Sequence, residues 1–477
     1  MAAAKPRKLI GFGAPGHHAG RAMPSGVRQA VGRRAFEADM MSPKGLDDRT
    51  ESRHAVQIAH EMAAEAWGAD LCRFVTGGST QSLHTALSAV VRPGEAVILA
   101  RNAHKAEWST MLYAGYRPVL LPVAIDPAWD VEHGVSPATL ERVIAANPEA
   151  RAVVVVSPTY FGVTSNIAAL ARVAHAAGLP LIVDGAWGGA FPFCSRLPAN
   201  PLAQGADVMV ASLHKTMGAM AQGSVLLARG DLVDQERLAL AFEIFETTSL
   251  SVPILASMDA TRRDHAEKGE RLWGDLLDLA AEARADLAGI EGVRLFGREG
   301  LDGDAAFDLD ESKILLDISA WGVAGYAVDD WLFREYRMSV GLSDARHLLA
   351  IAALGTGKGD LRQLGQGLRR LQGELSRDPS LLPRVPVGIP PLSALDCDLV
   401  MPGVKAFFAE VEKVPIEQAA GRIAAETLAP APPGVPRLVP GQRISAEHVA
   451  WLTLNREAGM FLLDPSDPSG HCVRVVR

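Results

Sequence analysis

The chain has 477 residues, of which 48% are hydrophobic and 21% are charged, and its formal net charge is −8. This composition predicts a globular protein of two or three domains, and the lack of any run of five like charges argues against nucleic-acid binding. Cys72, Cys194, Cys397 and Cys472 have no metal-ligand spacing, which argues against a zinc site and fits a reducing compartment. Because neither a signal-peptide core nor a membrane-spanning apolar run is present, we expect a cytoplasmic protein.

The first 50 residues are rich in Gly, Pro, Arg and Met and predict an irregular N-terminal arm. From residue 51 to about 265, helical and strand patterns alternate, and the strands are nearly continuous β-branched runs. This alternation predicts a large α/β domain with a parallel sheet covered by helices on both faces. The expected helices are 51–68, 79–91, 104–115, 136–147 and 166–178, and the expected strands are 72–78, 96–100, 117–124, 152–158, 180–186, 208–211 and 224–228.

The second half of the chain changes character twice. Residues 262–289 predict a long amphipathic helix, and the shorter patterns that follow predict a small α+β domain over 266–375. From residue 376 the chain becomes Pro-rich, so we expect a C-terminal domain over 376–477 that is partly irregular.

Polar residues follow the expected strands where each strand ends, and ligands of open α/β sheets gather at these carboxyl ends. Each polar group alone has an ordinary explanation, such as a helix N-cap for the loop 76–80 or a solvated side chain for Lys215. Together they combine a phosphate-binding helix start, a carboxylate at a buried strand end (Asp184) and a lysine. That combination is what pyridoxal 5'-phosphate (PLP) requires of a protein.

Seven segments resemble sequence blocks of one family, the ornithine/lysine/arginine decarboxylases among the fold-type I PLP enzymes, in the family's order and over nearly the whole chain. The most specific are SLHKTMGAMAQGSVLL at 212–227 and TGGSTQSLHTAL at 76–87. The others are GAPGHHAGRAMP at 13–24, RNAHKAEWSTMLYAGYRPVLL at 101–121, the region 153–188, ETTSLSVPILASMDATR at 246–262 and the PAPPGVP-containing tail at 421–444.

The resemblance implies a mostly parallel seven-stranded sheet in the large domain, a bound PLP and a role for each matching residue. Lys215 would form the Schiff base with the cofactor, Asp184 would pair with the pyridine nitrogen, and His104 would stack on the ring. Proton return to the substrate carbon would come from Lys215 or His214. The implied cofactor-binding residues are Gly78, Ser79, Thr80, His104, Asp184, Ala186, Trp187, Ser212, His214, Lys215, Thr248 and Ser249, without a metal.

Thr248 and Ser249 would reach the site of a neighbouring subunit, which implies a homodimer or a higher homo-oligomer with shared active sites. The chain resembles the short form of the family, without the N-terminal response-regulator-like domain. The implied reaction is PLP-dependent decarboxylation of an amino acid, such as lysine, ornithine, arginine or a modified relative, to the amine and CO₂.

Three positions depart from the family pattern. Gly341 stands where an acidic residue linked to the distal cation of the substrate is usual, Ala431 replaces a tyrosine, and His18 replaces a lysine. Asp344 is a candidate to replace the missing acid. Two alternatives stay open: another PLP reaction on the same scaffold, namely aldol cleavage, elimination or transamination, or a non-catalytic family member that acts as a binding partner.

Overall fold

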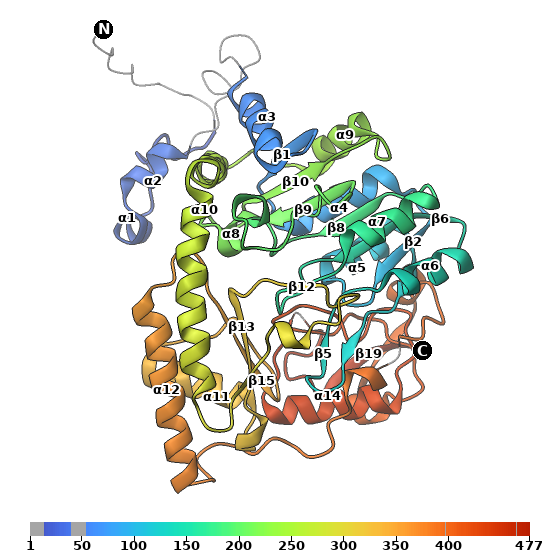
Figure 1. The fold of residues 1–477 in the computed structure, drawn as a ribbon. Helices are drawn as coiled ribbons and strands as arrows, with labels where there is room; N and C mark the ends of the chain where they lie inside the picture. Colours follow the sequence, from blue (N-terminus) through green and yellow to red (C-terminus); the bar gives the residue numbers. More distant parts are fainter. Residues whose placement is uncertain (1–13, 40–53, 396, 464) are drawn as a thin grey trace.

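The computed structural model describes residues 14–39, 54–395, 397–463 and 465–477. In Figure 1 the large sheet and its helices occupy the upper part of the molecule. The long helix α10 (Val252–Ala288) runs down one side, and the C-terminal segment lies below the sheet. The fold is therefore a large α/β part to which two smaller parts are attached at the lower edge.

The large part contains a seven-stranded sheet with the strand order β1-β10-β9-β8-β6-β2-β3. Six strands run in the same direction, and β10 is antiparallel to both of its neighbours. The expected mostly parallel seven-stranded sheet is confirmed. The strands are β1 (Leu71–Val75), β2 (Ala96–Ala100), β3 (Arg117–Leu121), β6 (Ala150–Val156), β8 (Leu181–Asp184), β9 (Val208–Ser212) and β10 (Ser224–Ala228).

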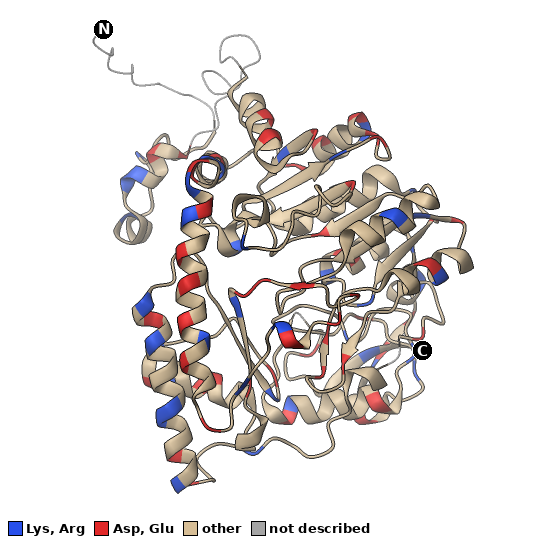
Figure 2. Ribbon diagram, viewed as in Figure 1, with Lys and Arg blue, Asp and Glu red and all other residues tan. Residues whose placement is uncertain are grey.

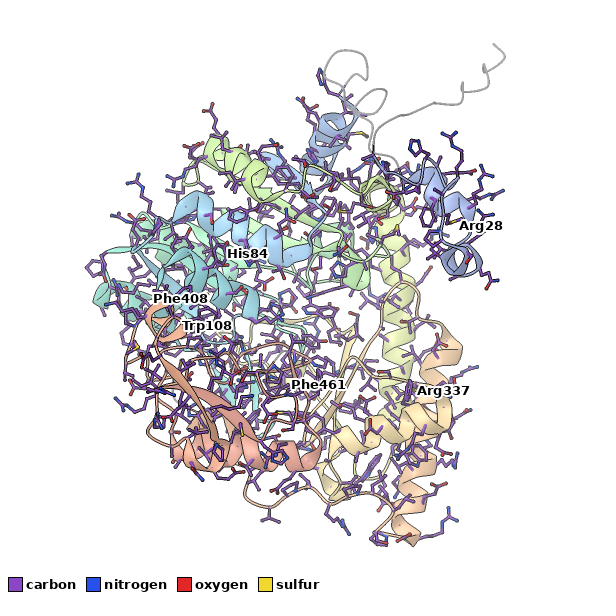
Figure 3. The ribbon with its side chains drawn as sticks, turned by 180° about the vertical axis from the view of Figure 1, so that it is seen from behind. Arg28, His84, Trp108, Arg337, Phe408 and Phe461 are labelled. Carbon is purple, nitrogen blue, oxygen red and sulfur yellow. The ribbon has the colours of Figure 1, made fainter. Side chains whose placement is uncertain are left out.

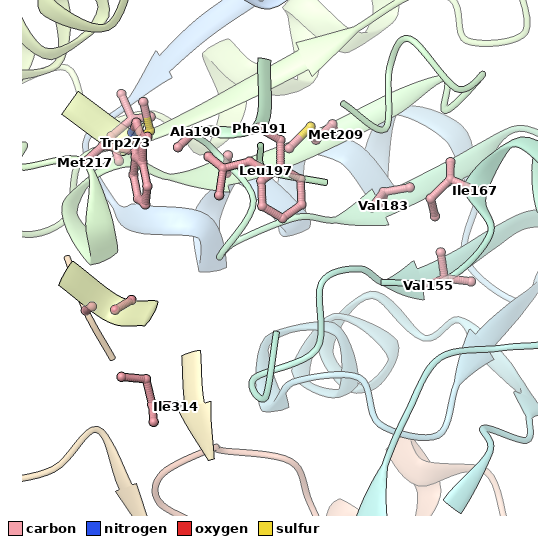
Figure 4. Packing of buried hydrophobic residues seen from close by; sticks show 14 of the residues in the cluster. Val155, Ile167, Val183, Ala190, Phe191, Leu197, Met209, Met217, Trp273 and Ile314 are labelled. Atoms are coloured by element: carbon pink, nitrogen blue, oxygen red, sulfur yellow. The ribbon is translucent and has the colours of Figure 1, made fainter. Parts of the chain in front are cut away.

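Helices cover both faces of this sheet because successive strand residues point to opposite sides. Val153 and Val155 of β6 belong to the cluster beneath α3, α7 and α10, whereas Val154 packs with α4, α5 and α9 on the other face. Figure 4 shows Val155 and Val183 of neighbouring strands on the first face, beside Ile167 of α7. The helices are α3 (Ala55–Trp67), α4 (Gly78–Val90), α5 (Lys105–Ala114), α6 (Pro137–Ala146), α7 (Ile167–Ala176), α8 (Leu213–Thr216) and α9 (Gln235–Phe245).

Helix α10 joins the large part to a four-stranded sheet with the order β11-β13-β15-β14. It packs against α3 of the large part and against β11 and α12 of the small one, so the expected boundary at 265/266 lies within a continuous helix. Lys/Arg and Asp/Glu residues are interspersed along α10 and α12 (Figure 2). The elements are β11 (Arg294–Leu295), β13 (Lys313–Asp317), α11 (Gly325–Tyr336), β14 (Leu342–Ser343), β15 (His347–Ile351) and α12 (Lys358–Arg377).

The C-terminal segment has a hydrophobic cluster of its own, which includes Ile416, Leu438, Leu452 and Val473. Its elements are α13 (Gly403–Phe407), β16 (Val411–Pro415), β17 (Ala429–Pro430), α14 (Ala446–Ala458), β18 (Leu462–Leu463) and β19 (Cys472–Val476). The remaining short elements are β4 (Ile125–Asp126), β5 (Val131–Glu132), β7 (Val163–Thr164), β12 (Asp308–Leu309), η1 (Phe191–Phe193), η2 (Arg298–Gly300), η3 (Ser319–Trp321), η4 (Leu392–Ala394) and η5 (Ile416–Gln418).

Two local predictions were wrong. The segment expected to be irregular contains two short helices, α1 (Ser25–Val31) and α2 (Arg33–Ala38), separated by Gly32. Helix α10 begins at Val252, ten residues before the expected start at 262, because Pro253 occupies its first turn, where a proline costs no hydrogen bond. Among the described residues, no helix is long and apolar enough to cross a membrane.

Candidate active site

A cavity of about 410 Å³ lies at the carboxyl ends of the parallel strands. This size is typical of a pocket for a small-molecule ligand or cofactor. The structure brings ten of the twelve predicted cofactor-binding residues together in its wall. They are Gly78, Ser79, Thr80, His104, Asp184, Ala186, Trp187, Ser212, His214 and Lys215.

One end of the cavity is formed by the start of α4 and the end of β9. Gly78 has a φ of +75°, a conformation that residues with a Cβ rarely adopt, and it opens the first turn of α4. The amide groups of such a first turn lack partners within the helix and point toward the ligand side. The hydroxyls of Ser79 and Ser212 lie 2.6 Å apart, so α4 and β9 present two polar groups to the same place.

Lys215 follows β9 directly and lies in the single-turn helix α8. Its Nζ lies 4.4 Å from the ring centroid of Trp187, which places the amine over the indole face. Burial lowers the pKa of Lys215; the charge of Lys313 acts in the same direction, and the charge of Asp184 opposes it. The amine is therefore closer to its neutral, nucleophilic form than an exposed lysine would be.

Asp184 is the last residue of β8 and is only 4% exposed. Its Oδ1 accepts a hydrogen bond of 3.0 Å from the backbone N–H of Ala186, which fixes one oxygen of the carboxylate. A buried carboxylate with so few donors of its own is suited to a protonated ring nitrogen.

His104 is the N-cap of α5, and its Nδ1 accepts a hydrogen bond of 3.2 Å from Ala106 N. The proton of the neutral ring is therefore on Nε2. Burial lowers the pKa of His104. The ring is held against the backbone of Gly434, because Lys105 N donates to Gly434 O at 2.9 Å and a Cβ on Gly434 would lie 2.7 Å from Nε2.

His214 has the opposite tautomer. Its Nδ1 donates to the backbone carbonyl of Gly223 at 2.9 Å, and burial lowers the pKa of the ring. A neutral His214 therefore carries its proton on Nδ1 and an unprotonated Nε2.

Thr248 and Ser249 do not line this cavity. Both are exposed, and the Ser249 hydroxyl lies 2.9 Å from that of Thr247. The sequence predicts that these two residues contact the cofactor of a neighbouring subunit. The structure contains one chain, so this role stays a prediction.

The sequence did not single out several residues of the cavity wall. Pro433 and Val435 come from the C-terminal segment, where the PPGVP signature was the only signal and carried no assigned role. Glu132 comes from β5 and is held by Arg437, a pairing across 305 residues that no local pattern reveals. Gln222 precedes β10.

A second cavity of about 460 Å³ adjoins the first and shares Glu132, Phe161 and Pro433 with it. Gly341, the position of the usual acid, has no room for a side chain, because a Cβ there would lie 2.5 Å from Cδ1 of Ile351. Asp344 lines the second cavity, but its carboxylate already accepts hydrogen bonds from Nδ1 of His347 and from two backbone amides.

Comparison with known proteins decides the family. A model of the major domain of Orn/Lys/Arg decarboxylases matches residues 4–360, and a model of the C-terminal domain of the same enzymes matches residues 404–460. The chain belongs to the Orn/Lys/Arg decarboxylase family. It is an amino-acid decarboxylase, and the family is PLP-dependent.

Similar proteins support this assignment along the whole chain. The arginine decarboxylase of Bacillus subtilis (strain 168) is 32% identical over 471 residues, covering 99% of this chain and 95% of the relative. An arginine decarboxylase of Halalkalibacterium halodurans is 33% identical over 473 residues, covering 98% and 94%. The lysine decarboxylase of Francisella novicida has the same fold, with a TM-score of 0.80, 21% identity and coverage of 98% and 79%. The predicted family and fold class are confirmed.

Proposed function

We propose that the cavity holds pyridoxal 5'-phosphate and that this decarboxylase acts on arginine. The observation that carries the proposal is the convergence of Lys215, Asp184 and His104 in one cavity whose other wall holds the Ser79–Ser212 pair. Bound there, PLP supplies an electron sink for the pair of electrons left on the substrate carbon when CO₂ departs.

The residues present fit the cofactor group by group. The first turn of α4 and the hydroxyls of Ser79 and Ser212 would hold the phosphate. Asp184 would hold the proton of the ring nitrogen by charge, and His104 and Trp187 supply aromatic faces within the same cavity. Lys215 would hold the cofactor covalently, since its buried amine has a lowered pKa.

We assign the return of a proton to the substrate carbon to Lys215 and His214, because both line the cavity and both can carry a proton. Lys215 can regain a proton in this cavity, because the charge of Asp184 raises the pKa of its amine against the effect of burial. His214 has an unprotonated Nε2, so it can accept a proton and pass it on.

The proposal of arginine follows from the relatives, since both Bacillus subtilis and Halalkalibacterium halodurans relatives carry the name arginine decarboxylase. Space supports it, because the second cavity extends the site beyond Glu132. Asp130 lines this cavity, and a carboxylate there suits a long cationic side chain.

We further propose that a second copy of the chain covers the face next to α9. His84, Tyr113 and Phe245 form an aromatic cluster there, and the ring centroids of His84 and Tyr113 are 5.2 Å apart. Figure 3 labels His84 of this cluster. Leu240 and Ile244 are 66% and 78% exposed on the same helix as Phe245. Thr248 and Ser249 follow this helix, where a partner's cavity would meet them.

The first test is an assay of the purified chain with PLP and arginine, lysine or ornithine, following CO₂ and the amine product. We expect CO₂ and agmatine in equal amounts from arginine, with turnover reduced to background in Lys215→Ala and unchanged in the exposed control Lys358→Ala. CO₂ from lysine or ornithine alone would correct the substrate. A keto acid or aldehyde in place of CO₂, or an active Lys215→Ala enzyme, would overturn the proposed mechanism.

The dimer is tested by sedimentation of the cofactor-loaded protein. We expect twice the mass of one chain, and Ile244→Glu should shift the protein toward the monomer because it buries a charge in an apolar contact. A wild-type protein that sediments as one chain contradicts the shared-site arrangement.

A further inference from the structure

A buried glutamate lies behind the candidate active site and has no role in the proposed mechanism. Glu107 is in the first turn of α5, three residues after His104, and its side chain is fully buried. It is absent from the wall of the cavity, so neither cofactor nor substrate contacts it there. A carboxyl group in such a place is costly unless it is paired or uncharged.

The neighbour of Glu107 is Asp184. The two carboxyl groups lie within reach of one hydrogen bond, and Lys215 is the cation that acts on both. No described residue donates to either oxygen of Glu107 with hydrogen-bond geometry; its own backbone N–H merely approaches it. Two ionised carboxylates both accept and neither donates, so their contact becomes a hydrogen bond only when one carries a proton.

Position decides which of the two carries the proton. Asp184 faces the cavity, and its Oδ1 already accepts a hydrogen bond from the backbone N–H of Ala186. Glu107 is fully buried and has no such donor. In agreement, burial and then the charge of Asp184 raise the pKa of Glu107 well above its usual range.

We propose that Glu107 is a protonated positioning residue that donates a hydrogen bond to Asp184 and so holds that carboxylate toward the cavity. The orientation of Asp184 toward the cavity rests on the proposed function, because only a bound cofactor gives Asp184 a ring nitrogen to face. The protonation of Glu107 and its hydrogen bond to Asp184 concern the protein alone and do not depend on the cofactor. Partners of this kind orient the group that makes the direct contact.

The first test is infrared spectroscopy of the full chain with the cofactor removed, at neutral pH, with ¹³C-labelled glutamate. A protonated carboxyl group absorbs apart from ionised ones, and the label distinguishes glutamate from aspartate. We expect a labelled band of a protonated acid that persists in the exposed control Glu141→Gln and is lost in Glu107→Gln. Wild-type protein without such a band overturns the proposal, whether or not the variant folds.

The second test is the pH dependence of unfolding for the same cofactor-free proteins. The titratable groups that act on Glu107 are Asp184 on β8 and Lys215 on α8. The folded chain keeps a proton on Glu107 that the unfolded chain loses above about pH 4.3. As the pH rises above this value, the folding constant of the wild type should therefore fall relative to that of Glu107→Gln. The expected slope is about tenfold per pH unit until Glu107 ionises. Parallel curves contradict a protonated Glu107.

The positioning role is tested by cofactor affinity. Glutamine keeps the shape and an N–H donor, whereas leucine removes the donor. We expect Glu107→Leu to weaken PLP binding by about tenfold, the loss of one hydrogen bond to a charged group, and Glu107→Gln to restore most of it. Equal affinity in both variants contradicts positioning. If no variant, wild type included, binds PLP, the proposed function fails while the infrared result still stands.

Discussion

Arg437 forms a two-point ion pair with Glu132: Nη1 lies 2.8 Å from Oε1 and Nη2 lies 3.1 Å from Oε2. Both side chains are 9% exposed. Burial would raise the pKa of Glu132, but the charge and hydrogen bonds of Arg437 outweigh it and lower the pKa. The pair therefore ties the C-terminal segment to the wall of the site.

Removing one partner of this pair should be more damaging than removing both. Arg437→Met leaves an uncompensated buried carboxylate and should lower the free energy of unfolding by about 3 kcal/mol, whereas Glu132→Leu/Arg437→Met should recover most of it. Denaturant titration measures both. Since the folded pKa of Glu132 is depressed, the stabilisation is complete above about pH 4.3 and is lost as the pH falls through the folded pKa. A double variant less stable than the single one would contradict this account.

Gly434→Ala should disturb His104. The new methyl group would lie 2.7 Å from Nε2, so the ring must move, and we expect turnover to fall by about tenfold or more through lost orientation. Gly421→Ala is the matched control, because it has the same φ of about +80° in the same segment and nothing within 4 Å of the added Cβ. Both variants should lose a similar 1–2 kcal/mol of stability, about that expected for backbone strain. Equal turnover in the two would rule out a role for the Gly434–His104 contact.

The two hydroxyl pairs of α4 should behave differently. Ser79→Ala removes one hydroxyl at the phosphate end and should weaken PLP binding by about tenfold. Ser82→Ala breaks a similar pair, in which the Ser82 and Ser224 hydroxyls lie 2.8 Å apart, but both residues are buried away from the cavity. That variant should lose stability and keep its affinity for PLP. Titration of PLP absorbance on the two variants makes the comparison.

His347 should make stability depend on pH near neutrality. Burial and the charge of Arg346 lower the pKa of His347, whereas Asp344, 2.9 Å from Nδ1, and Asp317 raise it. The two carboxylates have the larger effect, so the pKa of His347 in the folded protein is raised. The stabilisation is thus complete below about pH 6.5 and disappears as the pH rises through the folded pKa. Unfolding measured across this range should show wild type losing stability relative to His347→Gln, and a constant difference would contradict a charged His347.

Local sequence predicted most of the sheet and the part of the site that follows its strands. Asp184, Ser212 and Lys215 were found because the ends of neighbouring parallel strands must meet at one edge of a sheet. Pro433, Gly434 and Glu132 were missed because their places depend on how the C-terminal segment packs, which no periodicity encodes. Glu107 was missed for another reason: in a helical pattern a lone glutamate indicates a solvated face, and only tertiary packing buries it.

The contact between Gly434 and His104 also makes completion of the candidate site depend on the last part of the sequence. A chain growing from its N-terminus presents Ser79, Asp184 and Lys215 well before the segment that carries Gly434 and Pro433 has been made. Until that segment folds, the cavity lacks part of its wall and His104 lacks the backbone that supports it. A chain cut ahead of residue 430 would therefore lack Pro433 and Val435 of the cavity wall and the Gly434 carbonyl that accepts from Lys105 N.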